Sequence, residues 1–149
     1  MTEPLLSKAK LERRPLNATE LRILEVLRQD YLPFSAYDLM DRLRGLGVRS
    51  PNTVYRALNR LVADRSVHRL ETLNAYVACK QSDLGMDRDP MFAICDTCGS
   101  VEEFEAASIA SSLTTRTKSF DFALNSMTVE LRGTCRTCRP SPTARSNEV

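Results

Sequence analysis

Four of the five cysteines in this chain form two short pairs, Cys95-x-x-Cys98 and Cys135-x-x-Cys138. A Cys-x-x-Cys turn directs two sulfur atoms toward one point, and two such turns supply the four sulfurs of a tetrahedral metal site. Zn²⁺ accepts four thiolates at about 2.3 Å in a closed shell that leaves no position for a substrate. The spacing therefore predicts one structural zinc site per subunit, and two disulfides in a secreted protein are the alternative.

The start of the chain does not have the pattern of an exported protein. Residues 1–15 carry charges every few positions and lack the apolar core of a signal peptide. No segment approaches the roughly 18 apolar residues that a membrane-spanning helix needs. We therefore expect a protein of the reducing cytoplasm, where paired cysteines bind metal more often than they oxidise.

The charge of the chain is unevenly distributed, although its composition, with 42% apolar and 27% charged residues, is ordinary for a globular protein. Residues 1–79 contain 13 lysines and arginines against 9 acidic residues, whereas residues 80–149 contain 8 against 10. Between residues 42 and 69, seven arginines stand against a single acid, Asp64. Such a cluster is typical of a surface that binds a polyanion, and it is also compatible with a solvated helical face.

Capping patterns predict two helices near the N-terminus. Asn17 with Glu20, and Ser35 with Asp38, each form a capping box in front of an apolar stripe. The first helix is expected to end near Asp30, before a proline, and the second to end at the glycines at 45 and 47.

A third helix is predicted from Asn52 to Ala63, because Ser50 provides an N-cap and Pro51 suits a first helical turn. Its periodicity buries Val54, Ala57, Leu58 and Leu61. Two β-rich runs, 67–71 and 75–79, follow and predict a hairpin. Three helices and a hairpin form a winged helix-turn-helix, whose third helix can enter the major groove of DNA.

Polar side chains on the outer face of this third helix are the candidate DNA contacts. Arg56 is expected to contact a base, because an arginine–guanine pair provides about 1–3 kcal/mol of discrimination. Tyr55 is placed to touch a thymine methyl group. Three further residues are placed for phosphates or base edges: Asn52, Thr53 and Arg60.

The C-terminal half shows a second pattern of elements. Residues 80–90 are polar and acidic, which indicates a hinge. Strands are predicted at 91–95 and 101–104, a helix at 106–118, and a further strand at 124–132. In this last strand Met127, Val129 and Leu131 are expected on the buried face, opposite polar residues that include Glu130.

Several segments resemble the ferric uptake regulator family. Ser50-Pro-Asn-Thr-Val-Tyr-Arg-Ala-Leu58 resembles its recognition helix, and Phe92-Ala-Ile-Cys-Asp-Thr-Cys-Gly99 resembles its first structural zinc clip. Segments 35–40 and 67–79 look most like the zinc uptake regulator branch, and the resemblance covers about residues 15–139. It implies a homodimeric, metal-dependent transcriptional repressor that binds double-stranded operator DNA.

The resemblance also implies an α+β fold with a defined domain order. A winged-helix DNA-binding domain would occupy residues 1–79 and a hinge residues 80–90. A small α/β domain for dimerisation and structural zinc binding would occupy 91–139, before a disordered tail at 140–149. The structural zinc ligands carry over completely, to Cys95, Cys98, Cys135 and Cys138.

A second, regulatory zinc site is implied by the resemblance but is matched only in part. Three of the family's four ligand positions hold suitable donors here: His68, Cys79 and Glu103. The fourth position, a histidine in the family, is occupied by Arg88, which has no lone pair to offer a metal. We expect Asp87, Asp89 or a water to complete the site, since zinc accepts a mixed N, S and O shell.

The expected function is therefore a zinc-responsive repressor and not an enzyme. A thiolate donor favours zinc over iron or manganese, and His68 is the single histidine of the chain. The four-cysteine shell is closed, and no catalytic dyad accompanies the second set of donors. Two alternatives are a regulator of the same fold that has lost second-site sensing, and a zinc-ribbon interaction module.

Overall fold

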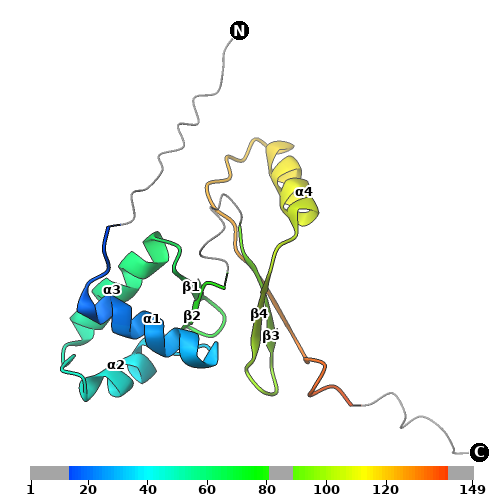
Figure 1. The fold of residues 1–149 in the computed structure, drawn as a ribbon. Coiled ribbons are helices and arrows are strands. Elements are labelled where there is room, and N and C mark those ends of the chain that lie inside the picture. Colours follow the sequence, from blue (N-terminus) through cyan, green and yellow to red (C-terminus); the bar gives the residue numbers. More distant parts are fainter. Residues whose placement is uncertain (1–13, 81–88, 141–149) are drawn as a thin grey trace, which may run out of the picture.

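Three helices and a three-stranded sheet lie on opposite sides of a β-hairpin in this protein (Figure 1). The structure is a computed structural model that describes residues 14–80 and 89–140. Its elements in chain order are α1 (Ala18–Asp30), α2 (Ala36–Arg44), α3 (Pro51–Ala63), β1 (Val67–Leu70), β2 (Ala75–Ala78), β3 (Met91–Cys95), β4 (Val101–Phe104), α4 (Ala107–Lys118) and β5 (Val129–Gly133). The predicted α+β fold class is confirmed.

Both predicted capping boxes are present, and they explain where α1 and α2 begin. The Asn17 side chain accepts a hydrogen bond from the Glu20 N–H at 2.9 Å, and Glu20 accepts one from the Asn17 N–H at 2.9 Å. Ser35 and Asp38 form the same pair of bonds at the start of α2. Ser50 differs from the prediction, because its side chain makes no capping bond and α3 begins at Pro51.

The helices and one face of the hairpin enclose the first core. The four residues predicted on the inner face of α3 are all buried there: Val54, Ala57, Leu58 and Leu61. They pack with Ile23, Leu27 and Leu39 from α1 and α2. Burying one such aliphatic side chain stabilises a fold by about 1.5–3 kcal/mol. The buried side chains of α3 therefore hold this helix in a fixed orientation relative to α1 and α2.

The hairpin β1–β2 is covered on both faces. Its register pairs Val67 with Ala78 and His68 with Val77, so that neighbouring positions point to opposite sides. One side contributes Val67, Tyr76 and Ala78 to the first core. The other side contributes Leu70 and Val77 to a second core, which is completed by Phe92, Ile94 and Val101 of the three-stranded sheet. The hairpin therefore joins the helices to the sheet.

The three-stranded sheet has the order β4-β3-β5, with β4 antiparallel and β5 parallel to the central strand. The strand predicted from residue 124 begins only at Val129. The reason is the partner strand, because Val129 pairs with Met91, which is the first residue of β3. The expectation that Leu131 is buried is also wrong for the single chain, where this side chain is 51% exposed.

Some predictions fall on residues outside those that the structure describes. These are residues 81–88 of the expected hinge, with Asp87 and Arg88, and residues 141–149 of the expected tail. Within the described ranges, none of the helices has both the length and the apolar character needed to cross a bilayer.

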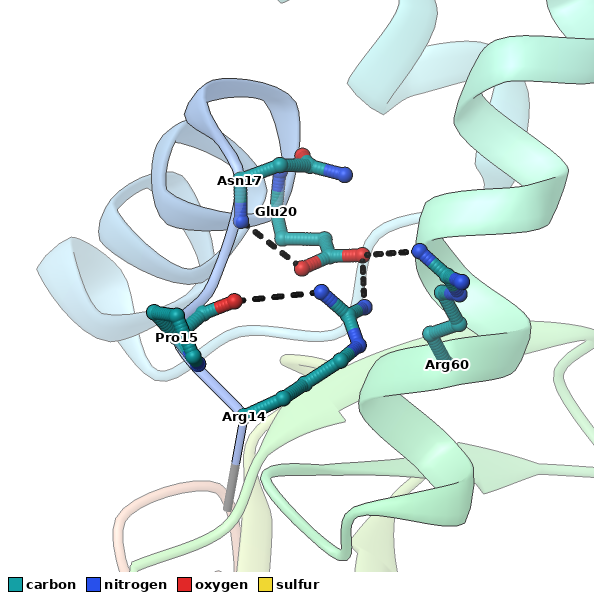
Figure 2. A network of polar contacts seen from close by, with 5 residues as sticks. All are labelled: Arg14, Pro15, Asn17, Glu20 and Arg60. Carbon is teal, nitrogen blue, oxygen red and sulfur yellow. Dashed lines mark hydrogen bonds and ion pairs between the residues drawn. The ribbon is translucent and has the colours of Figure 1, made fainter.

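Glu20 is a fully buried acid that holds two arginines. In Figure 2 its carboxylate lies between Arg14, which precedes α1, and Arg60 on α3. Arg14 Nη2 lies 2.6 Å and Arg60 Nη1 lies 3.6 Å from Glu20 Oε1. Burial raises the pKa of Glu20, but hydrogen bonds from Arg14 and Asn17 outweigh burial and hold the pKa below its ordinary value of 4.5. The buried charge is therefore stabilised by its partners, and it ties α1 to α3.

We expect Glu20→Gln to lower the free energy of unfolding by about 1–3 kcal/mol at pH 7, because it removes a charged acceptor from two arginines. A depressed folded-state pKa contributes stability above about pH 4.5 that is lost as the pH falls through that pKa. The difference in the free energy of unfolding between wild type and variant should therefore become smaller at acidic pH. Denaturant unfolding followed by helical circular dichroism measures it.

The matched control is Glu25→Gln, which removes an exposed acid from the same helix. It should leave the stability within about 0.5 kcal/mol of the wild type. Equal effects of the two substitutions at pH 7 would contradict the role given to Glu20.

Candidate metal centres and nucleic-acid interface

Two turns bring the four paired cysteines together beside the sheet. Cys95 ends β3 and Cys98 lies in the turn before β4, while Cys135 and Cys138 follow β5. The sulfur atoms of all four lie within 4.8 Å of one another, and those of Cys98 and Cys135 are 3.7 Å apart. A tetrahedron with Zn–S bonds of about 2.3 Å has S···S edges of about 3.8 Å. The four sulfurs therefore fit a zinc ion.

Backbone geometry supports the first of these turns. Gly99 has a φ of 73°, a conformation that glycine adopts without strain. Its N–H donates a hydrogen bond to the Cys95 carbonyl at 3.0 Å, which closes the turn that carries Cys98. All five cysteines of the chain are free thiols, so the disulfide alternative has no support here.

The four thiols differ in how readily they ionise. A hydrogen bond from the Cys135 N–H, together with one from Cys98, lowers the pKa of Cys95 to about 6. The sulfurs of Cys135 and Cys98 raise the pKa of Cys138 to about 12. Four thiolates this close repel one another unless a cation neutralises them, and the arrangement therefore suits a divalent metal.

The three donors of the second predicted site also meet, at the contact between hairpin and sheet. His68 comes from β1, Cys79 directly follows β2, and Glu103 lies on β4. Their donor atoms lie within 4.8 Å of one another. Glu103 Oε1 is 3.4 Å from His68 Nε2 and 3.5 Å from Cys79 Sγ. One nitrogen, one sulfur and one oxygen are thus directed at a single point.

His68 shows that this cluster is suited to a cation. Its Nε2 atom is buried and, among the described residues, has no partner with hydrogen-bond geometry. Burial lowers the pKa of His68, but the close contacts with Cys79 and Glu103, which do not reach hydrogen-bond geometry at Nε2, outweigh burial and raise the pKa to about 9. The cluster therefore stabilises positive charge, and a metal would have to displace a proton from His68 to bind.

Glu103 is oriented by more than its two neighbours in the cluster. Its second oxygen, Oε2, accepts a hydrogen bond from the Lys80 N–H at 2.9 Å. Burial raises the pKa of Glu103, but the contact with His68 and the hydrogen bond from the Lys80 N–H outweigh burial and lower the pKa. The ionised carboxylate is thus held with one oxygen toward His68 and Cys79.

The fourth ligand expected from the sequence is not identified by the geometry. Asp89 is described and is partly buried, but it is not among the residues whose donor atoms meet in the cluster. Asp87 and Arg88 lie outside the described residues.

The residues predicted to contact DNA lie together on the outer face of α3. Asn52, Thr53, Tyr55 and Arg56 are exposed, while the helix buries its opposite face in the first core. Arg60 is also exposed, yet its guanidinium is drawn toward the buried Glu20. Helical periodicity gave the outward position of Arg60 but not this ion pair, and Glu20 was assigned only a capping role.

Comparisons with known proteins agree with this geometry. Residues 16–132 match the Ferric uptake regulator family. The Zinc uptake regulation protein of Escherichia coli (strain K12) is 38% identical over 143 residues, which cover 92% of this chain and 82% of that protein. A solved structure of a zinc uptake regulator complexed with zinc and DNA is similar, with a TM-score of 0.80, 34% identity and 85% of each chain covered. Holo XcZur has a TM-score of 0.76 and 36% identity over 83% of this chain and 85% of that one. The chain therefore belongs to the ferric uptake regulator family.

Proposed function

We propose that this protein is a zinc-responsive transcriptional repressor that binds operator DNA as a homodimer in the cytoplasm. The observation that carries the proposal is the His68–Cys79–Glu103 cluster, which links the hairpin of the winged helix to the sheet. The similar zinc uptake regulator that was solved with zinc and DNA supports the proposal that this chain binds both zinc and DNA. Members of this family are regulators, so we do not assign an enzymatic activity.

Two zinc ions per subunit would have different roles. Cys95, Cys98, Cys135 and Cys138 would hold the structural one, in a closed shell that stabilises the fold. His68, Cys79 and Glu103, with a fourth ligand, would hold the regulatory one. A bound zinc ion supplies positive charge and directional bonds to donors from three segments. Because His68, Cys79 and Glu103 can share one ion only when the hairpin is docked on the sheet, zinc binding would favour the docked state.

The homodimer is supported by an uncovered apolar surface on the C-terminal elements. Leu131 of β5 is exposed. Four large apolar side chains of α4 and the turn after it are also exposed: Ile109, Leu113, Phe120 and Phe122. Large apolar side chains that are exposed in such numbers are typical of interaction sites. A second copy of the chain would cover them and present two α3 helices to one DNA duplex.

The positions of α3, the four-cysteine cluster and the exposed apolar side chains support the domain order expected from the sequence. We assign residues 1–79 to DNA binding, 80–90 to the hinge, 91–139 to dimerisation and structural zinc, and 140–149 to the tail. In this arrangement Arg56 reads a base, with Tyr55 beside it, and Asn52, Thr53 and Arg60 contact phosphates or base edges.

We expect the purified dimer to bind a second equivalent of zinc per subunit, which Cys79→Ser and Glu103→Gln each abolish. Each substitution replaces an anionic donor of the cluster with a weak neutral oxygen, and both leave the four-cysteine site intact. Zinc titration followed by metal analysis measures this. Glu102→Gln is the control, because it removes an exposed neighbouring acid outside the cluster. A wild type that stays at one equivalent per subunit would favour the alternative of a regulator without second-site sensing.

We expect Arg56→Ala to weaken binding to specific DNA by about five- to 150-fold, the range for losing one bidentate arginine–guanine contact. Its zinc content should not change, because Arg56 lies outside both metal clusters. Gel shifts at fixed salt measure the ratio of specific to random-sequence affinity. Lys118→Ala, which removes the same charge from the end of α4, should leave the ratio unchanged. Equal wild-type affinity for both DNAs would refute sequence-specific reading.

A further inference from the structure

A row of three side chains runs across the sheet on the face that meets the hairpin. Phe92 of β3 is paired with Glu103 of β4 on one side and with Glu130 of β5 on the other. Residues paired in this way point to the same face of a sheet. Phe92 is fully buried in the second core, and its ring lies 5.3 Å from that of His68. Two carboxylates therefore flank the central contact between hairpin and sheet.

Glu130 binds the turn of the hairpin, residues 71–74, from across this contact. Its Oε1 atom accepts a hydrogen bond from the Glu71 N–H at 2.7 Å, and its Oε2 atom accepts one from the Thr72 N–H at 3.0 Å. The Thr72 hydroxyl donates a third bond to Oε2. Burial raises the pKa of Glu130, but these bonds, that of the Thr72 side chain first, outweigh burial and lower the pKa. The carboxylate is thus ionised and committed to the hairpin.

The two carboxylates hold opposite ends of the hairpin. Glu103 accepts from the Lys80 N–H beyond the end of β2, next to His68 and Cys79, whereas Glu130 accepts at the turn. Glu103 belongs to the metal cluster, and Glu130 does not. The docked hairpin therefore has one attachment, through Glu103, that a bound metal would strengthen, and one, through Glu130, that involves no residue of the metal cluster.

We propose that Glu130 is a positioning residue for the regulatory site: by fixing the hairpin turn to the sheet, it keeps His68 and Cys79 close to Glu103 and so raises the affinity of this cluster for zinc. The inference rests on the proposed function of that cluster. Zinc binding and docking are linked, because His68 and Cys79 reach Glu103 only when the hairpin is docked. Loss of the Glu130 attachment lowers the docked population, and zinc binding must then restore it, so the apparent affinity falls.

The test compares wild type, Glu130→Gln and Thr72→Val, each loaded with structural zinc. Affinity for the second zinc equivalent is measured by competition with a chelator, without DNA. Glu130→Gln retains one acceptor oxygen, and we expect its affinity to fall about three- to tenfold with unchanged stoichiometry. Thr72→Val removes only the hydroxyl donor and should have a smaller effect in the same direction. Glu71→Gln is the control, because it changes a side chain of the same turn and keeps the backbone N–H that Glu130 binds.

A second measurement does not depend on the metal site. Hydrogen exchange at the Glu71 and Thr72 amides should be slow in the wild type and several-fold faster in Glu130→Gln. Equal exchange in the two proteins would overturn the attachment itself. Faster exchange with unchanged zinc affinity would overturn the positioning role. A wild type without a second zinc equivalent would overturn the sensing function, and the positioning role with it, while the exchange data would still decide the attachment.

Discussion

Burial of the hairpin β1–β2 on both faces is the constraint on which the arrangement of the chain depends. Neighbouring side chains of a strand point to opposite sides, so Val67 and Tyr76 pack with the helices while Leu70 and Val77 pack with the sheet. If the helices move relative to the sheet, one of these two cores must open and expose apolar surface. The second core is the smaller of the two, and it is the one beside the His68–Cys79–Glu103 cluster. A metal or ligand that binds at the contact between hairpin and sheet therefore acts on the core that costs less free energy to open.

Backbone N–H groups at the two ends of the hairpin are satisfied by carboxylates of the sheet rather than by other strands. Glu103 accepts from the Lys80 N–H, and Glu130 accepts from the Glu71 and Thr72 N–H groups. Bonds to ionised acceptors are about twice as strong as neutral ones, and each is available only while hairpin and sheet are in contact. Hydrophobic packing is non-directional, so these hydrogen bonds determine how the hairpin is oriented on the sheet. Charge is thus placed on both sides of Phe92, and the His68 ring lies against that phenylalanine.

The elements set by local chemistry could be predicted from the sequence, whereas the contacts between distant segments could not. Capping boxes located α1 and α2, because each box depends on residues close together in the chain. Cysteine spacing located the four-sulfur cluster although its two clips lie far apart in the chain, because one Cys-x-x-Cys clip supplies only two of the four sulfurs that a zinc site needs. The His68–Cys79–Glu103 cluster was expected only through the family resemblance. Alternation placed Glu130 on the polar face of its strand, opposite the face expected to be buried, but periodicity does not tell which face another element will cover. Arg60 was missed as an ion-pair partner for the same reason, since its partner Glu20 lies on another helix.

The two metal clusters are connected through β5. Cys135 and Cys138 follow this strand directly, and the Cys135 N–H donates to Cys95 Sγ at the end of β3 at 3.3 Å. The Asp96 N–H also donates to the Gly133 carbonyl at 2.8 Å, so the clip holds the end of β5 in register with β3. That register is what pairs Glu130 with Phe92 and directs its carboxylate at the hairpin turn. A metal bound by the four cysteines would therefore do more than stabilise the C-terminal fold, because it would fix the strand from which the hairpin is held in place.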